Sequence, residues 1–181
     1  MKLAVILALA LIATSIQAKQ NTLPATSQRP TSAAKAGAQT HDVGPPEAII
    51  QLKKFAAAYN RTMAKKQTSA LLNFYYDGTI PVIGSVSRLS FARMTEASHG
   101  KAPKIYASNA KDQSTGDTSA KATAEKMSNL RIRTDGTVAS IEYDYEIPQG
   151  YGHTFWTLVD TKNAWKITSI VYSINIRSAV K

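Results

Sequence analysis

Residues 130–147 read LRIRTDGTVASIEYDYEI, and this stretch decides the fold. Apolar and polar side chains alternate on both sides of Asp135-Gly136, a dipeptide typical of a tight turn between antiparallel strands. The same two-residue period continues toward the C-terminus. The sequence therefore predicts four consecutive antiparallel strands, over residues 123–133, 137–147, 153–161 and 165–176.

Apolar residues at helical spacing precede these strands. Pro45-Pro46-Glu47 is typical of a helix start, and Leu52, Phe55 and Tyr59 then recur on one side of a helix that runs to Met63. Four further features are expected: a helix from Thr68 or Ser69 to Asp77-Gly78, an edge strand over 80–83 that contains Pro81, a helix from Ser85 or Ser87 to Met94, and a loop over 107–120. Helices followed by an antiparallel meander predict an α+β fold.

The N-terminal region differs in composition from the rest. Residues 1–18 hold Lys2, an apolar run and a final alanine, which is typical of a secretory signal peptide. Residues 19–45 are rich in Pro, Ser and Thr and poor in large aliphatic residues, which predicts a disordered linker. The folded domain is then expected over 46–181. The expected location is periplasmic or secreted, without membrane contact after signal cleavage.

Composition excludes several kinds of site. The chain has no cysteine, so a disulfide framework, a thiolate metal site and a cysteine nucleophile are excluded. Its three histidines do not lie at ligand spacing, so we predict no metal and no cofactor. The net charge is +10, but the basic residues are spread along the chain. We therefore expect a solvated basic surface and no nucleic-acid partner.

The predicted turns give a register for the sheet. Loops at 135–136, 148–152 and 162–163 would place four hydroxyls in one cross-strand row on the face toward the helices: Ser128, Tyr143, Thr157 and Thr168. Trp156 would then point outward, and finding it on the same side as Tyr143 would show that the register is wrong. A bulge is most expected in the last strand. Ile167 and Ile170 are three residues apart and would point to opposite faces of a regular strand, yet both look buried.

A polar row in an apolar concave face suggests a small-molecule site. The predicted ligand-binding residues are Lys126, Ser128, Tyr143, Tyr145, Thr157 and Thr168. Tyr143 and His153 are candidate catalytic residues, since a phenol or an imidazole can transfer protons. The alternative is that these Thr and Tyr side chains satisfy one another's hydrogen bonds in an ordinary sheet. Glu142, Asp144 and Glu146 alternate on the other face, where cross-strand pairing with arginines is expected.

The second face would also carry an apolar patch of Trp156, Leu158, Trp165 and Ile167. An exposed patch with two tryptophans is typical of an interface, so we predict a homodimer through the outer sheet face. The alternative is that this patch is the true core and that the register is inverted.

The chain also resembles a known superfamily. The stretches FWTLV at 155–159 and AWKITSI at 164–170 resemble the W-x-L and W-K-I pattern of SnoaL-like members of the nuclear transport factor 2-like superfamily. The resemblance spans about residues 46–177 and implies a cone, in which a curved antiparallel sheet wraps round N-terminal helices and leaves a pocket. Some members are isomerases, dehydratases or hydrolases, and many bind ligands without known activity.

Three functions follow from these observations. The first is binding of a small, partly apolar ligand in the cone without established catalysis. The second is an isomerase, dehydratase or hydrolase acting in the same pocket. The third is a structural or interaction module that dimerises through the outer sheet face.

Overall fold

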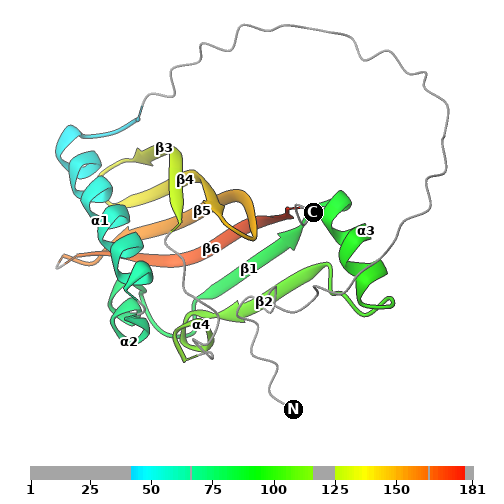
Figure 1. Cartoon of the computed structure of the whole chain (residues 1–181). Helices are drawn as coiled ribbons and strands as arrows, with labels where there is room; N and C mark the ends of the chain where they lie inside the picture. The colour runs from blue at the N-terminus through cyan, green and yellow to red at the C-terminus, as the bar shows by residue number, and fades with distance from the viewer. Residues whose placement is uncertain (1–41, 66, 116–124, 163, 178–181) are drawn as a thin grey trace, which may run out of the picture.

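The computed structural model describes residues 42–65, 67–115, 125–162 and 164–177, and these form a curved sheet with helices against it (Figure 1). The helical elements are α1 (Pro46–Ala64), α2 (Thr68–Leu71), the short 3-10 helix η1 (Leu72–Phe74), α3 (Arg88–Ala97) and α4 (Ala110–Thr115). The strands are β1 (Pro81–Val86), β2 (Ile105–Asn109), β3 (Lys126–Thr134), β4 (Val138–Ile147), β5 (Gly150–Asp160) and β6 (Trp165–Ile176). The α+β prediction is confirmed. No helix within the described ranges is long and apolar enough to span a membrane.

The described part of the domain begins before residue 46. The predicted signal peptide, residues 1–18, and residues 19–41 of the predicted linker lie outside the described residues. Asp42, however, accepts a hydrogen bond from the Ile132 backbone N–H at 3.0 Å and pairs with Lys53 at 2.7 Å. Val43 forms a parallel bridge with Arg133 of β3. These contacts attach residues 42–43 to the free edge of the sheet, so they belong to the folded domain.

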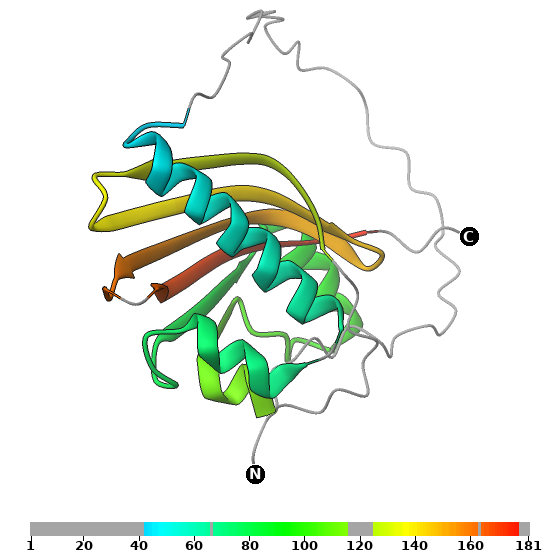
Figure 2. The same cartoon turned by 90° about the vertical axis from the view of Figure 1, so that its left-hand side faces the viewer.

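Helix α1 crosses the concave face of the sheet (Figure 2). A proline in its first turn and Glu47 near its positive N-terminal end favour the observed start. Leu52, Ala56 and Tyr59 form its buried side, as the helical spacing predicted. Burying three such side chains against the sheet stabilises the helix far more than its intrinsic propensity does.

The sheet has six strands in the order β2-β1-β6-β5-β4-β3. β1 is not an edge strand as predicted: it pairs in parallel with β6 and antiparallel with β2. Pro81 is tolerated because it is the exposed first residue of β1. The prediction of a loop over 107–120 is also wrong for its first part, which completes β2 and forms α4. The Asn109 side chain accepts the Asp112 N–H at 2.8 Å and supports the start of that helix.

The β3–β4 turn is longer than predicted. Asp135 accepts hydrogen bonds from the backbone N–H groups of Thr137 and Val138, so Ile132 pairs with Ile141 rather than with Ala139. This shift is by two residues, which keeps each side chain on its predicted face. A bulge between Ser128 and Arg131 then changes the parity, so that Ser128 opposes Asp144 instead of Tyr143.

The β4–β5 turn is shorter than predicted. Ile147 pairs with Gly150 instead of His153, a shift of three residues that inverts the faces of β5. Gly150 and Gly152 lie inside the strand, where an added Cβ would meet neighbouring atoms at 2.3 Å and 2.0 Å respectively. These glycines permit close approach to β6 and do not form a loop. Trp156 consequently lies on the same side as Tyr143, with ring centroids 5.3 Å apart, so the predicted register is wrong.

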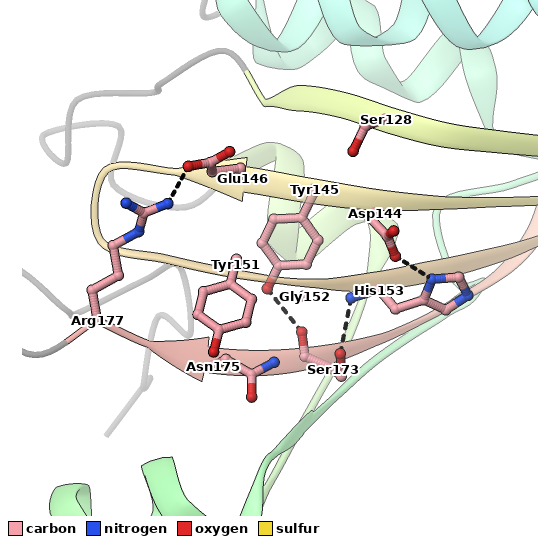
Figure 3. A pocket seen from close by; sticks show the side chains of 10 residues that line it. All are labelled: Ser128, Asp144, Tyr145, Glu146, Tyr151, Gly152, His153, Ser173, Asn175 and Arg177. Atoms are coloured by element: carbon pink, nitrogen blue, oxygen red, sulfur yellow. Dashed lines mark hydrogen bonds and ion pairs between the residues drawn. The ribbon is translucent and has the colours of Figure 1, made fainter. Parts of the chain in front are cut away.

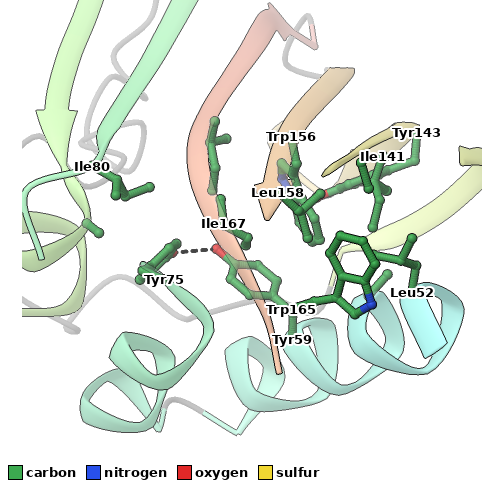
Figure 4. Packing of buried hydrophobic residues seen from close by; sticks show 14 of the residues in the cluster. Leu52, Tyr59, Tyr75, Ile80, Ile141, Tyr143, Trp156, Leu158, Trp165 and Ile167 are labelled. Atoms are coloured by element: carbon green, nitrogen blue, oxygen red, sulfur yellow. Dashed lines mark hydrogen bonds between the residues drawn. The ribbon is translucent and has the colours of Figure 1, made fainter. Parts of the chain in front are cut away.

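The predicted bulge in the last strand is confirmed. Leu158 pairs with Ile167, whereas Thr157 pairs with Ser169, so one extra residue lies in β6 at this point. Ile167 and Ile170 are both buried as a result. The core is the concave side of the sheet with α1 packed on it (Figure 4).

The four residues predicted to form a dimer interface are core residues. Trp156, Leu158 and Ile167 are at most 1% exposed and Trp165 is 6% exposed. The Trp156 ring packs edge-on against Tyr59 of α1 at 4.7 Å between centroids. The alternative interpretation, that this patch is the core, is the correct one. The homodimer stays a prediction, now without an assigned surface.

Candidate functional site

The concave interior contains a group of polar side chains among aromatic rings. We call Tyr59, Tyr75, Glu125 and Tyr143 the interior polar cluster. They come from α1, from the residue after η1, from the residue before β3 and from β4. The Tyr143 hydroxyl donates to Glu125 Oε2 at 3.1 Å. The Tyr59 and Tyr75 hydroxyls lie 2.8 Å apart, as the dashed line in Figure 4 shows.

Burial shifts the pKa values of this cluster upward. It raises the pKa of the Glu125 carboxyl, an effect that the Tyr143 hydrogen bond opposes. Burial is also the largest cause that raises the pKa of Tyr143 and of Tyr59 well above the usual value, and that of Tyr75 to about 12. The phenols therefore remain protonated donors at neutral pH, while the carboxyl ionises less readily than an exposed one.

Neighbouring residues hold Glu125 in place and leave hydrogen-bonding capacity unused. The Asn60 amide donates to the Glu125 backbone carbonyl at 2.9 Å, and its own Oδ1 is buried without a protein partner. Glu125 is only partly buried, so the cluster reaches the boundary of the core. Two phenols beside the Trp156 ring, an amide acceptor and a carboxyl suit the polar end of a small apolar molecule.

The opposite face of the sheet carries a second feature, an open depression of about 530 Å³ that we call the outer groove (Figure 3). Its lining residues are Ser128, Asp144, Tyr145, Glu146, Tyr151, Gly152, His153, Ser173, Asn175 and Arg177. His153 Nδ1 lies 2.9 Å from Asp144 Oδ1, and Asn129 donates to the other Asp144 oxygen at 2.7 Å. The Asn129 bond first, and His153 next, hold the Asp144 pKa below its usual range.

Acidic residues gather on this face of the sheet. Glu142 lies 3.8 Å from His153 Nε2 and 4.0 Å from an Arg131 nitrogen. This agrees with the cross-strand pairing with arginines that the sequence predicted for the alternating carboxylates. Within the part of the chain that the structure describes, no group of three or more His, Asp or Glu side chains is arranged to hold a metal ion.

Comparison with known proteins identifies the fold. No protein-family model and no curated protein matches the chain. An NTF-2-like protein from Silicibacter pomeroyi is 16% identical, with a TM-score of 0.51, and the match covers 71% of this chain and 97% of that one. A cystatin-like fold protein from Burkholderia xenovorans is 10% identical, with a TM-score of 0.50, over 74% and 95% of the two chains.

An NTF2-like protein with a cystatin-like fold from Novosphingobium aromaticivorans is 12% identical, with a TM-score of 0.51, over 74% and 85%. The chain has the nuclear transport factor 2-like fold. The cone that the sequence resemblance implied is thus confirmed, and the narrower SnoaL-like resemblance stays a prediction. Identities this low describe the cone and not its function.

The predicted ligand-binding residues divide between the two faces of the cone sheet. Tyr143 and Tyr145 are both buried in the core, and Tyr145 also lines the outer groove. Ser128 lines the outer groove, and Lys126 is exposed and pairs with Glu146 at 3.7 Å. The predicted row of four hydroxyls does not exist, because the turn and bulge shifts change the parity of the strands.

Two of the predicted hydroxyls satisfy each other. The Thr157 and Thr168 hydroxyls lie 2.8 Å apart, and Thr157 also lies 2.7 Å from the Ser169 hydroxyl. This is the alternative in which strand hydroxyls partner one another. Of the two candidate catalytic residues, Tyr143 belongs to the interior cluster, whereas His153 lies on the outer face beside Asp144.

Sequence reasoning missed Glu125, Tyr59 and Tyr75 as site residues. The helical spacing predicts Tyr59 on the apolar side of α1, which is where it lies, but gives no partner for its hydroxyl. Glu125 precedes β3 by one residue, and no motif marks it. Only the folded arrangement of α1, β3 and β4 brings these groups together.

Proposed function

We propose that the protein binds a small, partly apolar molecule on the concave side of the cone, with the polar end of that molecule at the interior polar cluster. The hydrogen bond between Tyr143 and Glu125 carries this proposal. The Tyr143 proton is used by Glu125, so this pair offers acceptor lone pairs, while the neighbouring Tyr59–Tyr75 pair keeps one O–H as a donor for a ligand that would otherwise meet only apolar surface.

Two probes of matched shape test this proposal: 1-naphthol, which offers a hydroxyl donor, and 1-tetralone, which offers a carbonyl acceptor. Binding is followed by tryptophan fluorescence, which comes from Trp165 and from Trp156, whose ring centroid lies 5.3 Å from that of Tyr143. We expect saturable binding of at least one probe and a loss of fivefold or more in Tyr143→Phe. Thr157→Ala removes a hydroxyl from the other face and is the matched control. Absence of binding for both probes, or equal binding by Tyr143→Phe, would refute the proposal.

A second candidate function is proton transfer at the same place. The observation that favours it is the upward shift of the Glu125 pKa, because a carboxyl that titrates closer to neutrality is a better general base or acid. The isomerase, dehydratase or hydrolase alternative requires such a group. If it holds, the protein should accelerate deuterium exchange at the α carbon of 1-tetralone in D₂O, measured by NMR. Glu125→Gln should abolish the acceleration while probe binding remains, and exchange no faster than with free acetate would reject catalysis.

We also propose that the protein is exported to the periplasm or secreted, on the basis of the signal-like composition of residues 1–18. Mass spectrometry of the mature chain tests this proposal, and retention of Met1 to Ala18 would contradict it.

The proposed homodimer is tested by sedimentation equilibrium of the full chain. The structural-module alternative is weakened, since the tryptophan patch that suggested it is buried.

A further inference from the structure

We propose that the outer groove is a second, independent binding site, and that it takes a neutral saccharide. The groove lies on the face of the sheet opposite α1 and opens between the ends of β3, β4, β5 and β6 (Figure 3). Its volume of about 530 Å³ falls within the range of roughly 300–1,000 Å³ typical of small-molecule sites. The proposal does not depend on the function proposed for the interior polar cluster.

The charged side chains in the groove already have hydrogen-bonding or ion-pair partners. Glu146 forms ion pairs with Arg177 and with Lys126, and Asp144 is held by Asn129 and His153. An anionic ligand would have to compete with Glu146 for Arg177, and a cationic ligand would have to displace Arg177 from Glu146. A neutral ligand avoids that cost because it needs no counter-ion of its own.

The paired groups nevertheless keep unused hydrogen-bonding capacity. Each carboxylate oxygen accepts more than one hydrogen bond, and a guanidinium has five donors of which a single carboxylate contact uses few. Acceptors at Asp144 and Glu146 therefore lie beside donors at Arg177 and Asn175 along one groove. A sugar presents neighbouring hydroxyls that each donate and accept, which matches such a mixed lining. The mutual pairing also fixes these side chains before a ligand arrives, which reduces the entropy lost on binding.

The groove also has an aromatic wall. Tyr151 is 51% exposed, and its ring stands in the groove beside Asn175 and Arg177 (Figure 3). An exposed aromatic ring provides an apolar surface on which the C–H face of a pyranose can stack, while its hydroxyl remains a polar handle. Tyr151 is held in this position because Gly150 and Gly152 on either side of it bring β5 close to β6. Aromatic ring, amide, carboxylates and guanidinium together favour a saccharide over a wholly apolar ligand.

The test uses three neutral disaccharides, cellobiose, maltose and N,N′-diacetylchitobiose, titrated into the full chain and followed by amide NMR shifts. We expect at least one to bind with millimolar or better affinity and to shift the Gly152 and His153 amides. Tyr151→Ala should weaken binding tenfold or more, and Asp144→Asn should weaken it fivefold or more. The matched control is Tyr76→Ala, which removes another exposed tyrosine, 62% exposed, outside the groove lining.

Two further comparisons distinguish the groove from the interior polar cluster and from a site for charged ligands. Tyr143→Phe, in the interior polar cluster, should leave disaccharide binding unchanged, so failure of the interior proposal and failure of this one give different results. A charged sugar, cellobiouronic acid, should bind more weakly than cellobiose. The proposal is overturned if none of the three disaccharides binds at 20 mM, if binding survives in Tyr151→Ala, or if the charged sugar binds more tightly than the neutral one. Thermal melting of each variant checks that it is folded.

Discussion

Replacing Gly152 by alanine is the sharpest test of how β5 sits in the sheet. A Cβ at this position would lie 2.0 Å from the Ser173 carbonyl oxygen and 2.6 Å from the Tyr145 ring. The first contact is with backbone of the neighbouring strand, which cannot move without disturbing the β5–β6 ladder. The second displaces a ring whose hydroxyl donates to that same Ser173 carbonyl at 2.8 Å.

The expected cost follows from these two contacts. Overpacking of a well-packed interior costs about 1–3 kcal/mol, and loss of the Tyr145 hydrogen bond adds about 1 kcal/mol. We therefore expect Gly152→Ala to lower the free energy of unfolding by about 2–4 kcal/mol. In a domain of this size that corresponds to a fall in Tm of roughly 8–16 °C.

Urea unfolding followed by circular dichroism measures this change. The matched control is Gly78→Ala, where the nearest atom to the new Cβ is Lys111 Cβ at 3.3 Å, in a turn outside the sheet. That variant should differ from the parent protein by less than about 1 kcal/mol. If Gly152→Ala were as stable as Gly78→Ala, Gly152 would lie in a flexible loop, and the pairing of Ile147 with Gly150 would be refuted.

Three other outcomes are expected. Trp156→Ala should lower the free energy of unfolding by about 3–5 kcal/mol because the side chain is fully buried, whereas a surface tryptophan would cost under about 0.5 kcal/mol in the same denaturation experiment. Tyr143→Phe removes the hydrogen bond that lowers the Glu125 pKa, so this pKa, measured from the NMR shift of the Glu125 carboxyl carbon, should rise. An unchanged or lower pKa would contradict the hydrogen bond between Tyr143 and Glu125. Asn129→Ala should raise the Asp144 pKa toward its ordinary value. In the parent protein, ionised Asp144 stabilises the fold above its unfolded pKa, and this stability is lost as pH falls through the lower folded pKa. The variant should therefore lose less stability on acidification. An unchanged dependence of the free energy of unfolding on pH would count against the Asn129–Asp144 bond.

The elements of this fold were largely predictable, because they depend on local periodicity. The apolar spacing of Leu52, Phe55 and Tyr59 placed α1, and the two-residue period placed β3 to β6 within a few residues. Residues 105–109, IYASN, show no apolar–polar alternation, and the pairing with β1 that makes them a strand is not visible in the local sequence. The loop predicted there was therefore wrong.

The faces of the sheet were not predictable with the same ease, because side-chain direction depends on the parity of every turn. The glycines at 150 and 152 suggested a loop, yet they lie in the strand because β6 and Tyr145 approach too closely for any side chain. A shift of three residues at this one turn moved Trp156 and Leu158 from the predicted surface into the core. The bulge near Thr168 was predictable, since Ile167 and Ile170 required burial on one face despite their odd separation.

The same parity explains why one strand serves two candidate sites. Along β4, Tyr143 and Tyr145 lie in the buried core, whereas Asp144 and Glu146 lie in the outer groove, which Tyr145 also lines. The two faces also meet at Ser173: its carbonyl accepts from Tyr145 and its hydroxyl accepts from the His153 backbone N–H at 2.9 Å. A change in the position of Tyr145 therefore acts on Ser173 and through it on the β5 strand that lines the groove. The interior polar cluster and the outer groove are chemically separate, but they share the stretch of backbone that holds both in place, so the register of β4 against β5 is the property on which either function depends.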